Sequence, residues 1–166
     1  MARPWQSGRG DAPAGATYAG AMGVPWWQKL AGRTHATVFR ATGGRLGGRL
    51  AGIEQVLVTT TGRRSGQPRT TPLAATRDGA TLLLVASNGG APSHPAWYLN
   101  LSEHPQIRVE ARGATMTMTA RTALGPERER AWGLVVAANP GYARYATKAE
   151  RQIPVVVCEP GPTDGA

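Results

Sequence analysis

The chain has 166 residues and a formal net charge of +9, and 41% of its residues are hydrophobic, which fits one globular domain with one core. Its single cysteine, Cys158, excludes an internal disulfide framework, and with only three histidines a dedicated metal site is not expected. Because no apolar run approaches the roughly 20 residues that span a bilayer and the first thirty residues lack the apolar stretch of a secretory signal, the sequence predicts a cytoplasmic protein.

The positive charge is concentrated in the first third of the chain. Residues 1–52 contain seven basic groups and one acidic group, hence +6, whereas residues 53–166 contain twelve and nine, hence +3. Seventeen of the 19 basic residues are arginines. This bias fits either the codon usage of a GC-rich genome or a polyanionic partner, because the guanidinium fork matches phosphate and carboxylate. The N-terminal excess suggests contact with an anionic surface.

The first 24 residues are not predicted to contribute to the core. Residues 1–24 are rich in Gly, Ala and Pro without a helical or strand period, so we expect a disordered arm. Residues 25–52 are predicted to form an amphipathic helix followed by a Gly-rich linker. The helix either packs on its own domain or lies on anionic lipid with Trp26 and Trp27 in the interface.

From Ile53 onward, alternating apolar and β-branched residues predict strands. The predicted strands are 55–61, 69–76, 81–87, 107–112, 115–124 and 153–159, with a hairpin turn at 77–79 and short helices at 96–103 and 126–139. Strands without a regular strand–helix alternation favour a small antiparallel barrel over a Rossmann sheet. We therefore predict a mainly β, six-stranded barrel with short flanking helices at 53–160, followed by a tail at 161–166. So small a barrel holds no ligand inside, and binding is expected in outer grooves or at a subunit interface.

The turn Thr61–Arg69 is the first candidate site. Its sequence, Thr-Gly-Arg-Arg-Ser-Gly-Gln-Pro-Arg, combines two glycines with three guanidinium groups and a hydroxyl. In such a turn, backbone N–H groups and arginine forks can converge on a phosphate. The spacing is not that of a P-loop. A plain polar turn with solvated arginines stays open as the alternative.

Two later segments also carry candidate residues. Ser87-Asn88-Gly89-Gly90 follows an apolar strand, and its double glycine permits close approach of the backbone to a ligand. His94 is expected to cap the next helix. Tyr142 and Tyr145 share one face of a helical turn, with ordinary packing as the alternative. The sequence contains no Ser-His-Asp set or carboxylate pair, and Cys158 is predicted to be a buried apolar residue.

Taken in order, these segments resemble the deazaflavin-dependent nitroreductase family, whose members use coenzyme F420. The match runs over residues 53–160. It rests on Thr59–Arg69, Pro72-Leu73, Arg77-Asp78-Gly79, Ser87–Gly90, His94-Pro95-Ala96-Trp97-Tyr98-Leu99-Asn100-Leu101, Pro140-Gly141-Tyr142 and Ile153-Pro154-Val155.

The resemblance implies a split β-barrel and hydride transfer from the reduced deazaflavin ring to a quinone, enone or nitro-type acceptor. The F420 tail, a phosphate followed by lactyl and glutamate units, would give the arginine-rich turn its partner. The cofactor-binding residues implied are Arg63, Arg64, Ser65, Arg69, Pro72, Ser87, Asn88, Gly89, Gly90, Trp97 and Asn100. The residues implied at the acceptor are Ser87, Tyr142 and Tyr145.

The chain departs from the family pattern where Asn139 replaces a tyrosine of the nitro-reducing members, which favours quinone or enone acceptors over nitroimidazoles. Two alternatives remain: an FMN-dependent enzyme on the same barrel, and a non-catalytic F420 carrier. A nucleic-acid binder is disfavoured, because strands 69–76 and 106–112 contain no aromatic residue. We expect a monomer or homodimer, with possible membrane contact through Trp26 and Trp27.

Overall fold

The computed structural model describes residues 49–50 and 52–161. The predictions for the N-terminal arm, for the helix with Trp26 and Trp27 and for residues 162–166 therefore lie outside the described residues. None of the helices in the described part of the chain has the length and apolar character that a bilayer crossing requires.

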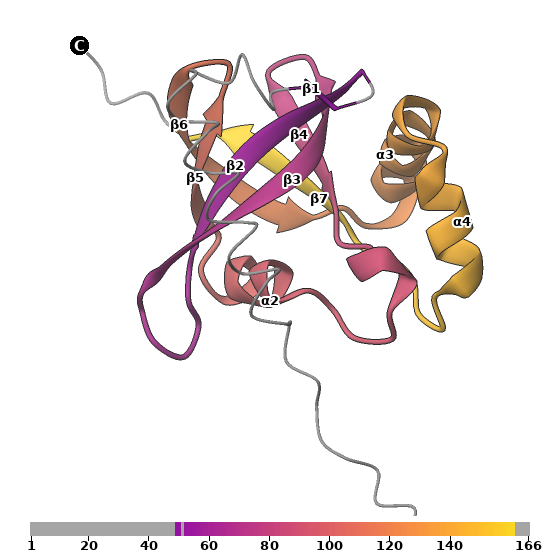
Figure 1. Ribbon diagram of the computed structural model, residues 1–166, viewed down its shortest axis with the longest axis horizontal. Helices are drawn as coiled ribbons and strands as arrows, with labels where there is room; N and C mark the ends of the chain where they lie inside the picture. Colours follow the sequence, from indigo (N-terminus) through magenta and orange to yellow (C-terminus); the bar gives the residue numbers. More distant parts are fainter. Residues whose placement is uncertain (1–48, 51, 162–166) are drawn as a thin grey trace, which may run out of the picture.

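Six antiparallel strands close into a barrel (Figure 1), as the alternating pattern predicted. The six barrel strands are β2 (Ile53–Thr61), β3 (Pro68–Asp78), β4 (Thr81–Val85), β5 (Gln106–Ala111), β6 (Ala114–Thr122) and β7 (Val155–Pro160), and a seventh strand of two residues, β1 (Arg49–Leu50), pairs with β2. Their order is β1-β2-β3-β4-β7-β6-β5, and pairing of β2 with β5 closes the barrel. The helical segments are η1 (Asn88–Gly90), α2 (Ala96–Glu103), α3 (Gly125–Ala138) and α4 (Gly141–Lys148).

Several strand boundaries differ from the prediction by one or two residues, and the differences at β1 and at the β3–β4 turn concern the connections. Arg49–Leu50, predicted to lie in the linker, pairs with β2 as the short strand β1. The β3–β4 turn is shorter than expected, because Asp78 still pairs with Thr81 and only two residues connect the strands. Gly79 adopts φ 64 there, a conformation that glycine takes without steric cost.

Apolar side chains fill the barrel interior. Alternate residues of the strands point inward, among them Val56, Val58, Leu82 and Leu84. Cys158 belongs to this cluster and is fully buried, and burial raises the pKa of its thiol to about 12. The thiol thus stays protonated and unreactive at neutral pH, which confirms its prediction as a buried apolar residue.

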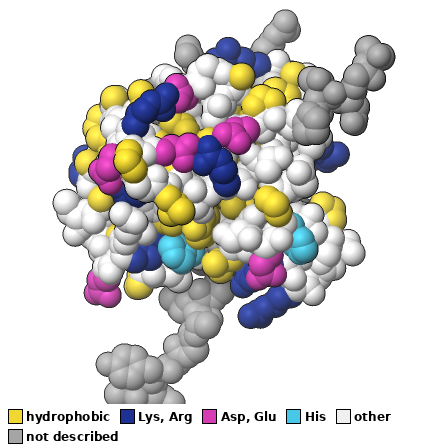
Figure 2. All heavy atoms as spheres, turned by 180° about the vertical axis from the view of Figure 1, so that it is seen from behind, with side chains coloured by type: hydrophobic (Ala, Val, Ile, Leu, Met, Phe, Trp, Pro, Cys, Tyr) yellow, Lys and Arg dark blue, Asp and Glu magenta, His cyan; other side chains and the backbone are white. Residues whose placement is uncertain are grey.

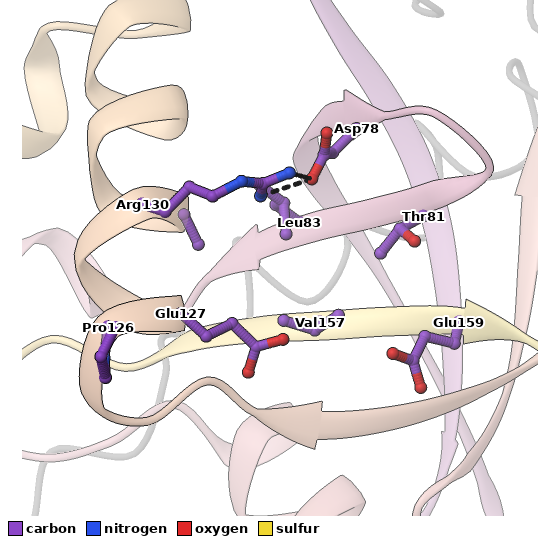
Figure 3. Close-up of a pocket in the computed structure, with 9 residues that line it drawn as sticks. Asp78, Thr81, Leu83, Pro126, Glu127, Arg130, Val157 and Glu159 are labelled. Atoms are coloured by element: carbon purple, nitrogen blue, oxygen red, sulfur yellow. Dashed lines mark hydrogen bonds and ion pairs between the residues drawn. The ribbon is translucent and has the colours of Figure 1, made fainter.

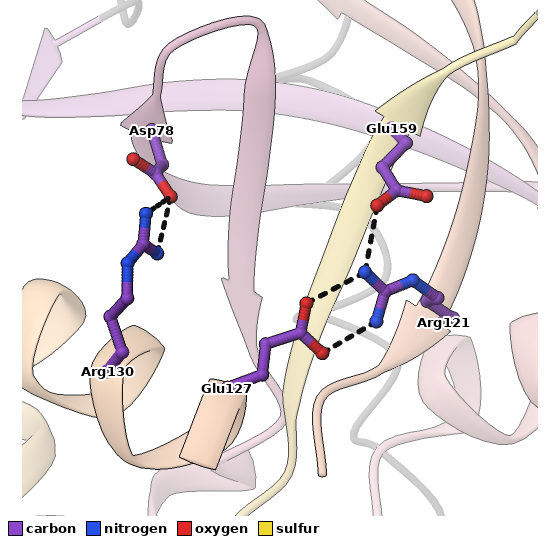
Figure 4. Close-up of polar contacts among 5 residues, drawn as sticks. All are labelled: Asp78, Arg121, Glu127, Arg130 and Glu159. Carbon is purple, nitrogen blue, oxygen red and sulfur yellow. Dashed lines mark hydrogen bonds and ion pairs between the residues drawn. The ribbon is translucent and has the colours of Figure 1, made fainter. Parts of the chain in front are cut away.

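A second apolar cluster lies outside the barrel, where α3 covers β4 and β7 (Figure 1). Ion pairs fix α3 there: Arg121 on β6 bridges Glu127 at 2.7 Å and Glu159 at 2.8 Å, and Arg130 donates to Asp78 at 2.6 Å (Figure 4). On the face seen in Figure 2, acidic and basic side chains likewise lie next to one another. Much of the acidic charge of the described residues is thus neutralised by arginines.

The buried carboxylate of Glu54 joins three elements of the barrel. It accepts hydrogen bonds from Arg77 on β3 at 2.9 Å and from Arg112 in the β5–β6 turn at 3.1 Å. Burial alone raises the pKa of Glu54, but the hydrogen bonds and charges of these two arginines outweigh it, so the pKa lies below the ordinary value. A carboxyl group with a lowered folded-state pKa stabilises the fold above its unfolded pKa and loses that contribution as the pH falls through the folded value.

We expect Glu54→Gln to lower the free energy of unfolding by about 1–3 kcal/mol at pH 7, a range kept low because Arg112 is largely solvated. The difference from wild type should shrink below about pH 4.5, where the unfolded carboxyl becomes protonated. Urea unfolding of both proteins at pH 7 and pH 3.5 measures this. A difference independent of pH would contradict the role of the charge.

Candidate active site

The β2–β3 turn, Gly62–Gln67, is compact and held by its own backbone. The N–H of Gly62 donates to the Gln67 carbonyl at 2.8 Å, and the N–H of Gly66 donates to the Gly62 carbonyl at 2.7 Å. A Cβ at position 62 would lie 2.8 Å from Ser65 Oγ and 3.1 Å from the Gln67 carbonyl oxygen, so a larger residue there would have to displace the Ser65 side chain and shift the turn slightly. Ser65 Oγ accepts a long hydrogen bond, 3.4 Å, from the N–H of Gln67.

Two arginines of this turn, Arg63 and Arg64, and Arg69 at the start of β3 have no ion-pair partner in the described residues. Arg64 and Arg69 are exposed and Arg63 is half-buried. None of the three has a carboxylate within 4.0 Å among residues 49–50 and 52–161, whereas five other arginines of that part do: Arg77, Arg112, Arg121, Arg128 and Arg130. The turn therefore offers concentrated positive charge to an anion from outside.

Helix α2 lies next to this turn, and hydrogen bonds of Asn100 connect the two. The Asn100 side chain is buried, accepts from the Arg63 N–H at 3.2 Å and donates to Thr60 Oγ1 at 3.1 Å. Trp97 is 7% exposed and packs with the barrel interior. Trp97 and Asn100, which the resemblance implied as cofactor-binding residues, thus point inward and fix the position of α2.

The loop after β4 is the second part of the candidate site. β4 ends at Val85 rather than at the predicted Ser87, because the chain turns into η1. Asn88, Gly89 and Gly90 take φ values of 49, 65 and 83 in succession. A positive φ is unusual for Asn88, because it is not a glycine. Around Gly89 there is open space, since a Cβ there would meet no atom within 4 Å.

Gly90 brings this loop against α4. A Cβ at position 90 would lie 3.1 Å from Lys148 Cβ and 3.2 Å from the Tyr145 carbonyl oxygen. The same helix carries the predicted phenols. Tyr142 is buried, Tyr145 is 37% exposed, and their ring centroids are 6.4 Å apart. Burial raises the pKa of Tyr142, opposed by the side chain of Asn139, so its hydroxyl stays a proton donor at neutral pH.

Asn139 forms the connection between α3 and α4. Its Oδ1 accepts from the N–H of Gly141 at 3.0 Å, and a Cβ at position 141 would lie 2.9 Å from that oxygen. The residue that replaces a tyrosine of the nitro-reducing members thus supports the start of α4.

The structure therefore groups the predicted residues in two parts at one end of the barrel, the lower end in Figure 1. One part is the β2–β3 turn with α2, and the other is the η1 loop with α4. Pro72 is set apart from both, since it lies within the β2–β3 ladder opposite Leu57.

Arg151, between α4 and β7, was not predicted. Its guanidinium donates to backbone carbonyls of the loop around η1, at 3.1 Å to Ala86 and 3.2 Å to Ser87. The prediction that His94 caps α2 is wrong, because Pro95 occupies the N-cap position and no side chain caps the helix. Instead, the His94 ring lies 5.0 Å from the Tyr98 ring. Burial and the charge of Arg151 lower the pKa of His94, which favours the neutral imidazole.

A separate groove of about 440 Å³ lies between α3 and strands β3, β4 and β7 (Figure 3). Asp78, Glu127, Arg130 and Glu159 line it, and no predicted site residue does. Its charged groups are those that fix α3 to the barrel. We therefore assign the candidate site to the other end of the barrel.

The residues at that end fit an elongated anionic cofactor. The turn supplies guanidinium groups without acidic partners in the described residues, the space around Gly89 is open, and Nη1 of Arg151 is buried without a hydrogen-bond partner in the same part of the chain. A deazaflavin ring with an anionic tail needs these features: donors and positive charge for the tail, and open backbone for the ring.

Comparisons with known proteins identify the family of the chain. The model of the F420H(2)-dependent quinone reductase family matches residues 30–160. An F420H(2)-dependent quinone reductase of Mycobacterium tuberculosis is 39% identical over 129 residues, which cover 75% of this chain and 87% of that protein.

Two solved structures are also similar. An F420-H2 dependent reductase is 43% identical with a TM-score of 0.60 and covers 63% of this chain and 93% of its own. A domain-swapped dimer is 35% identical with a TM-score of 0.61 and covers 81% and 97%. The chain belongs to the F420H(2)-dependent quinone reductase family.

Proposed function

We propose that this protein binds reduced F420 at the lower end of the barrel and reduces a quinone. The observation that carries the proposal is the group of three arginines, Arg63, Arg64 and Arg69, which has no acidic partner in the described residues while most arginines elsewhere in that part are paired. A string of phosphate and carboxylate groups is the ligand that such a cluster prefers.

Each part of the site has a role in this proposal. The turn holds the anionic tail, and the loop Ser87–Gly90 supports the ring, which supplies the hydride when bound. Tyr142 and Tyr145 on α4 face the acceptor, and their hydroxyls donate a hydrogen bond or proton to its oxygen. Because positioning supplies most of the rate in such a transfer, no acid–base dyad is required.

The acceptor class follows from α4 and its connection. Among the described residues, Tyr142 and Tyr145 are the phenols that α4 brings to the proposed site. The position of a further tyrosine of the nitro-reducing members is occupied by Asn139, whose Oδ1 accepts a hydrogen bond from the N–H of Gly141. This arrangement favours a quinone or enone, whose oxygen needs one donor, over a nitroimidazole.

The function is tested by mixing the protein with F420 and, separately, with FMN, and following cofactor fluorescence. The reduced form of the cofactor that binds is then oxidised with menadione. We expect F420 to bind and its reduced form to be oxidised steadily. Binding of FMN alone would indicate the FMN enzyme, and F420 binding without turnover would indicate a carrier.

We also propose peripheral membrane contact through Trp26 and Trp27, because quinones are lipid-soluble and tryptophans favour the interface. Full-length protein should co-sediment with anionic phosphatidylglycerol vesicles, and Trp26→Ala with Trp27→Ala should reduce the bound fraction several-fold. Equal sedimentation of both proteins would contradict this contact.

A further inference from the structure

One side chain holds together the loop on which the proposed ring-binding part depends. Arg151 donates from Nη2 to the carbonyls of Ala86, Ser87 and Ser93 at 3.1–3.2 Å, and from Nε to the carbonyl of Ala91 at 3.2 Å. A single guanidinium thus contacts both ends of the segment from Ala86 to Ser93, from a position about 60 residues further along the chain.

The loop has few other contacts that fix its shape. Gly89 and Gly90 take positive φ without steric cost, whereas the positive φ of Asn88 is uncommon for a non-glycine residue and is kept by its surroundings. Within the loop, the N–H of Gly90 donates to the Ser87 carbonyl at 2.9 Å and Asn88 Nδ2 donates to the Ser93 carbonyl at 3.0 Å. The segment is tied to the rest of the fold at its start, where the N–H of Ala86 donates to the Pro154 carbonyl at 3.0 Å, and at Gly90, which packs against α4. Arg151 adds hydrogen bonds to carbonyls at both ends of the segment.

One nitrogen of the Arg151 guanidinium, Nη1, makes no hydrogen bond within the described residues. Nη1 of Arg151 is buried and has no hydrogen-bond partner in the described part of the chain, and the same is true of Nδ1 of the nearby His94. A buried donor without a partner is costly, and it is satisfied when an acceptor or an ordered water arrives. The guanidinium that carries Nη1 bonds to the carbonyl of Ser87, the first residue of the segment that the proposed function assigns to the cofactor ring.

We propose that Arg151 is the positioning residue of the F420 site: its guanidinium holds the loop 86–93 in the conformation that places the ring against α4. This inference rests on the proposed function. It assigns Arg151 no contact with the reacting atoms, so its effect should appear in the rate of hydride transfer and in the mobility of the loop.

The test compares wild type with Arg151→Ala and Arg151→Lys by amide hydrogen exchange of peptides covering 86–94 and by menadione reduction with F420H2. In Arg151→Ala we expect exchange of the Gly90 and Ala91 amides to rise at least about tenfold. We expect kcat to fall by about 100-fold, with the KM for menadione nearly unchanged. Millimolar guanidinium should restore part of the rate, and lysine should restore less because its ammonium cannot span the four carbonyls.

The matched control is Arg121→Ala, which removes an arginine with three hydrogen bonds to Glu127 and Glu159 far from the loop. It should lower the melting temperature without changing exchange in 86–94 or kcat. The proposal is overturned by unchanged exchange in Arg151→Ala, or by an equal loss of kcat in Arg121→Ala. If wild type itself shows no turnover, the proposed function fails, and the exchange comparison alone decides the role of Arg151.

Discussion

Replacing Arg63 and Arg69 together with alanine is expected to weaken F420 binding by about 100-fold or more. Hydrogen bonds to charged groups contribute about 1.5–3 kcal/mol each, and two of them correspond to at least that factor. The arginines of the turn have no acidic partner in the described residues, so their removal breaks no ion pair of that part of the fold. Fluorescence titration of F420 measures the change in Kd.

The control for this prediction is Arg108→Ala with Arg130→Ala, which changes the net charge by the same amount. Arg108 lies on β5 between Thr117 of β6 and Thr59 of β2, and Arg130 on α3 pairs with Asp78 at the end of β3. If general electrostatic attraction explained binding, both double variants would lose affinity equally. We expect the control to stay within a few-fold of wild type, and an equal loss would refute the assignment of the tail to the turn.

Gly90→Ala is expected to reduce hydride transfer by about tenfold, because the loop and α4 must shift by a few tenths of an ångström and a displacement of about 1 Å in a positioned reaction costs about 100-fold. The new Cβ would lie 3.1 Å from Lys148 Cβ and 3.2 Å from the Tyr145 carbonyl, at φ 83. Both the loop and α4 must therefore move apart, and with them the proposed ring site and the phenols. Single-turnover oxidation of F420H2 by menadione measures the rate of the chemical step.

The control for the effect of backbone strain is the variant Gly79→Ala in the β3–β4 turn. Gly79 has φ 64, and a Cβ there meets no atom within 4 Å. Both variants should lose about 1 kcal/mol or more of stability from the positive φ. Only Gly90→Ala should lose the rate, and a normal rate in this variant would show that contact of the loop with α4 does not position the reaction.

The strands and turns of this barrel are predictable because their signals are local. Alternation places Val56 and Val58 inside, and the apolar surroundings of Cys158 predict its burial. The Gly-bounded turn with its arginines is also visible in the sequence, since both its closure and its charge come from residues within nine positions of one another.

The features that sequence reasoning missed depend on contacts between distant segments. Nothing local distinguishes Arg151 from other arginines, and its carbonyl partners lie 58–65 residues away. The inward orientation of Asn100 could not be predicted for the same reason, because it depends on the contacts of α2 with Thr60 and Arg63. One signal was available in the sequence. Arg151 stands just before the apolar strand 153–159, and its charged side chain does not contribute to the packing of that strand.

The central claim is that the cluster Arg63, Arg64 and Arg69 binds the anionic tail of the cofactor. The most direct measurement is the Kd of the wild-type protein for F420 and for its phosphate-free deazaflavin core, titrated at low and at high salt. We expect the core to bind at least about 100-fold more weakly, with an affinity that salt barely changes, whereas F420 loses affinity as salt screens the arginines. Equal affinities for the two compounds would contradict the account.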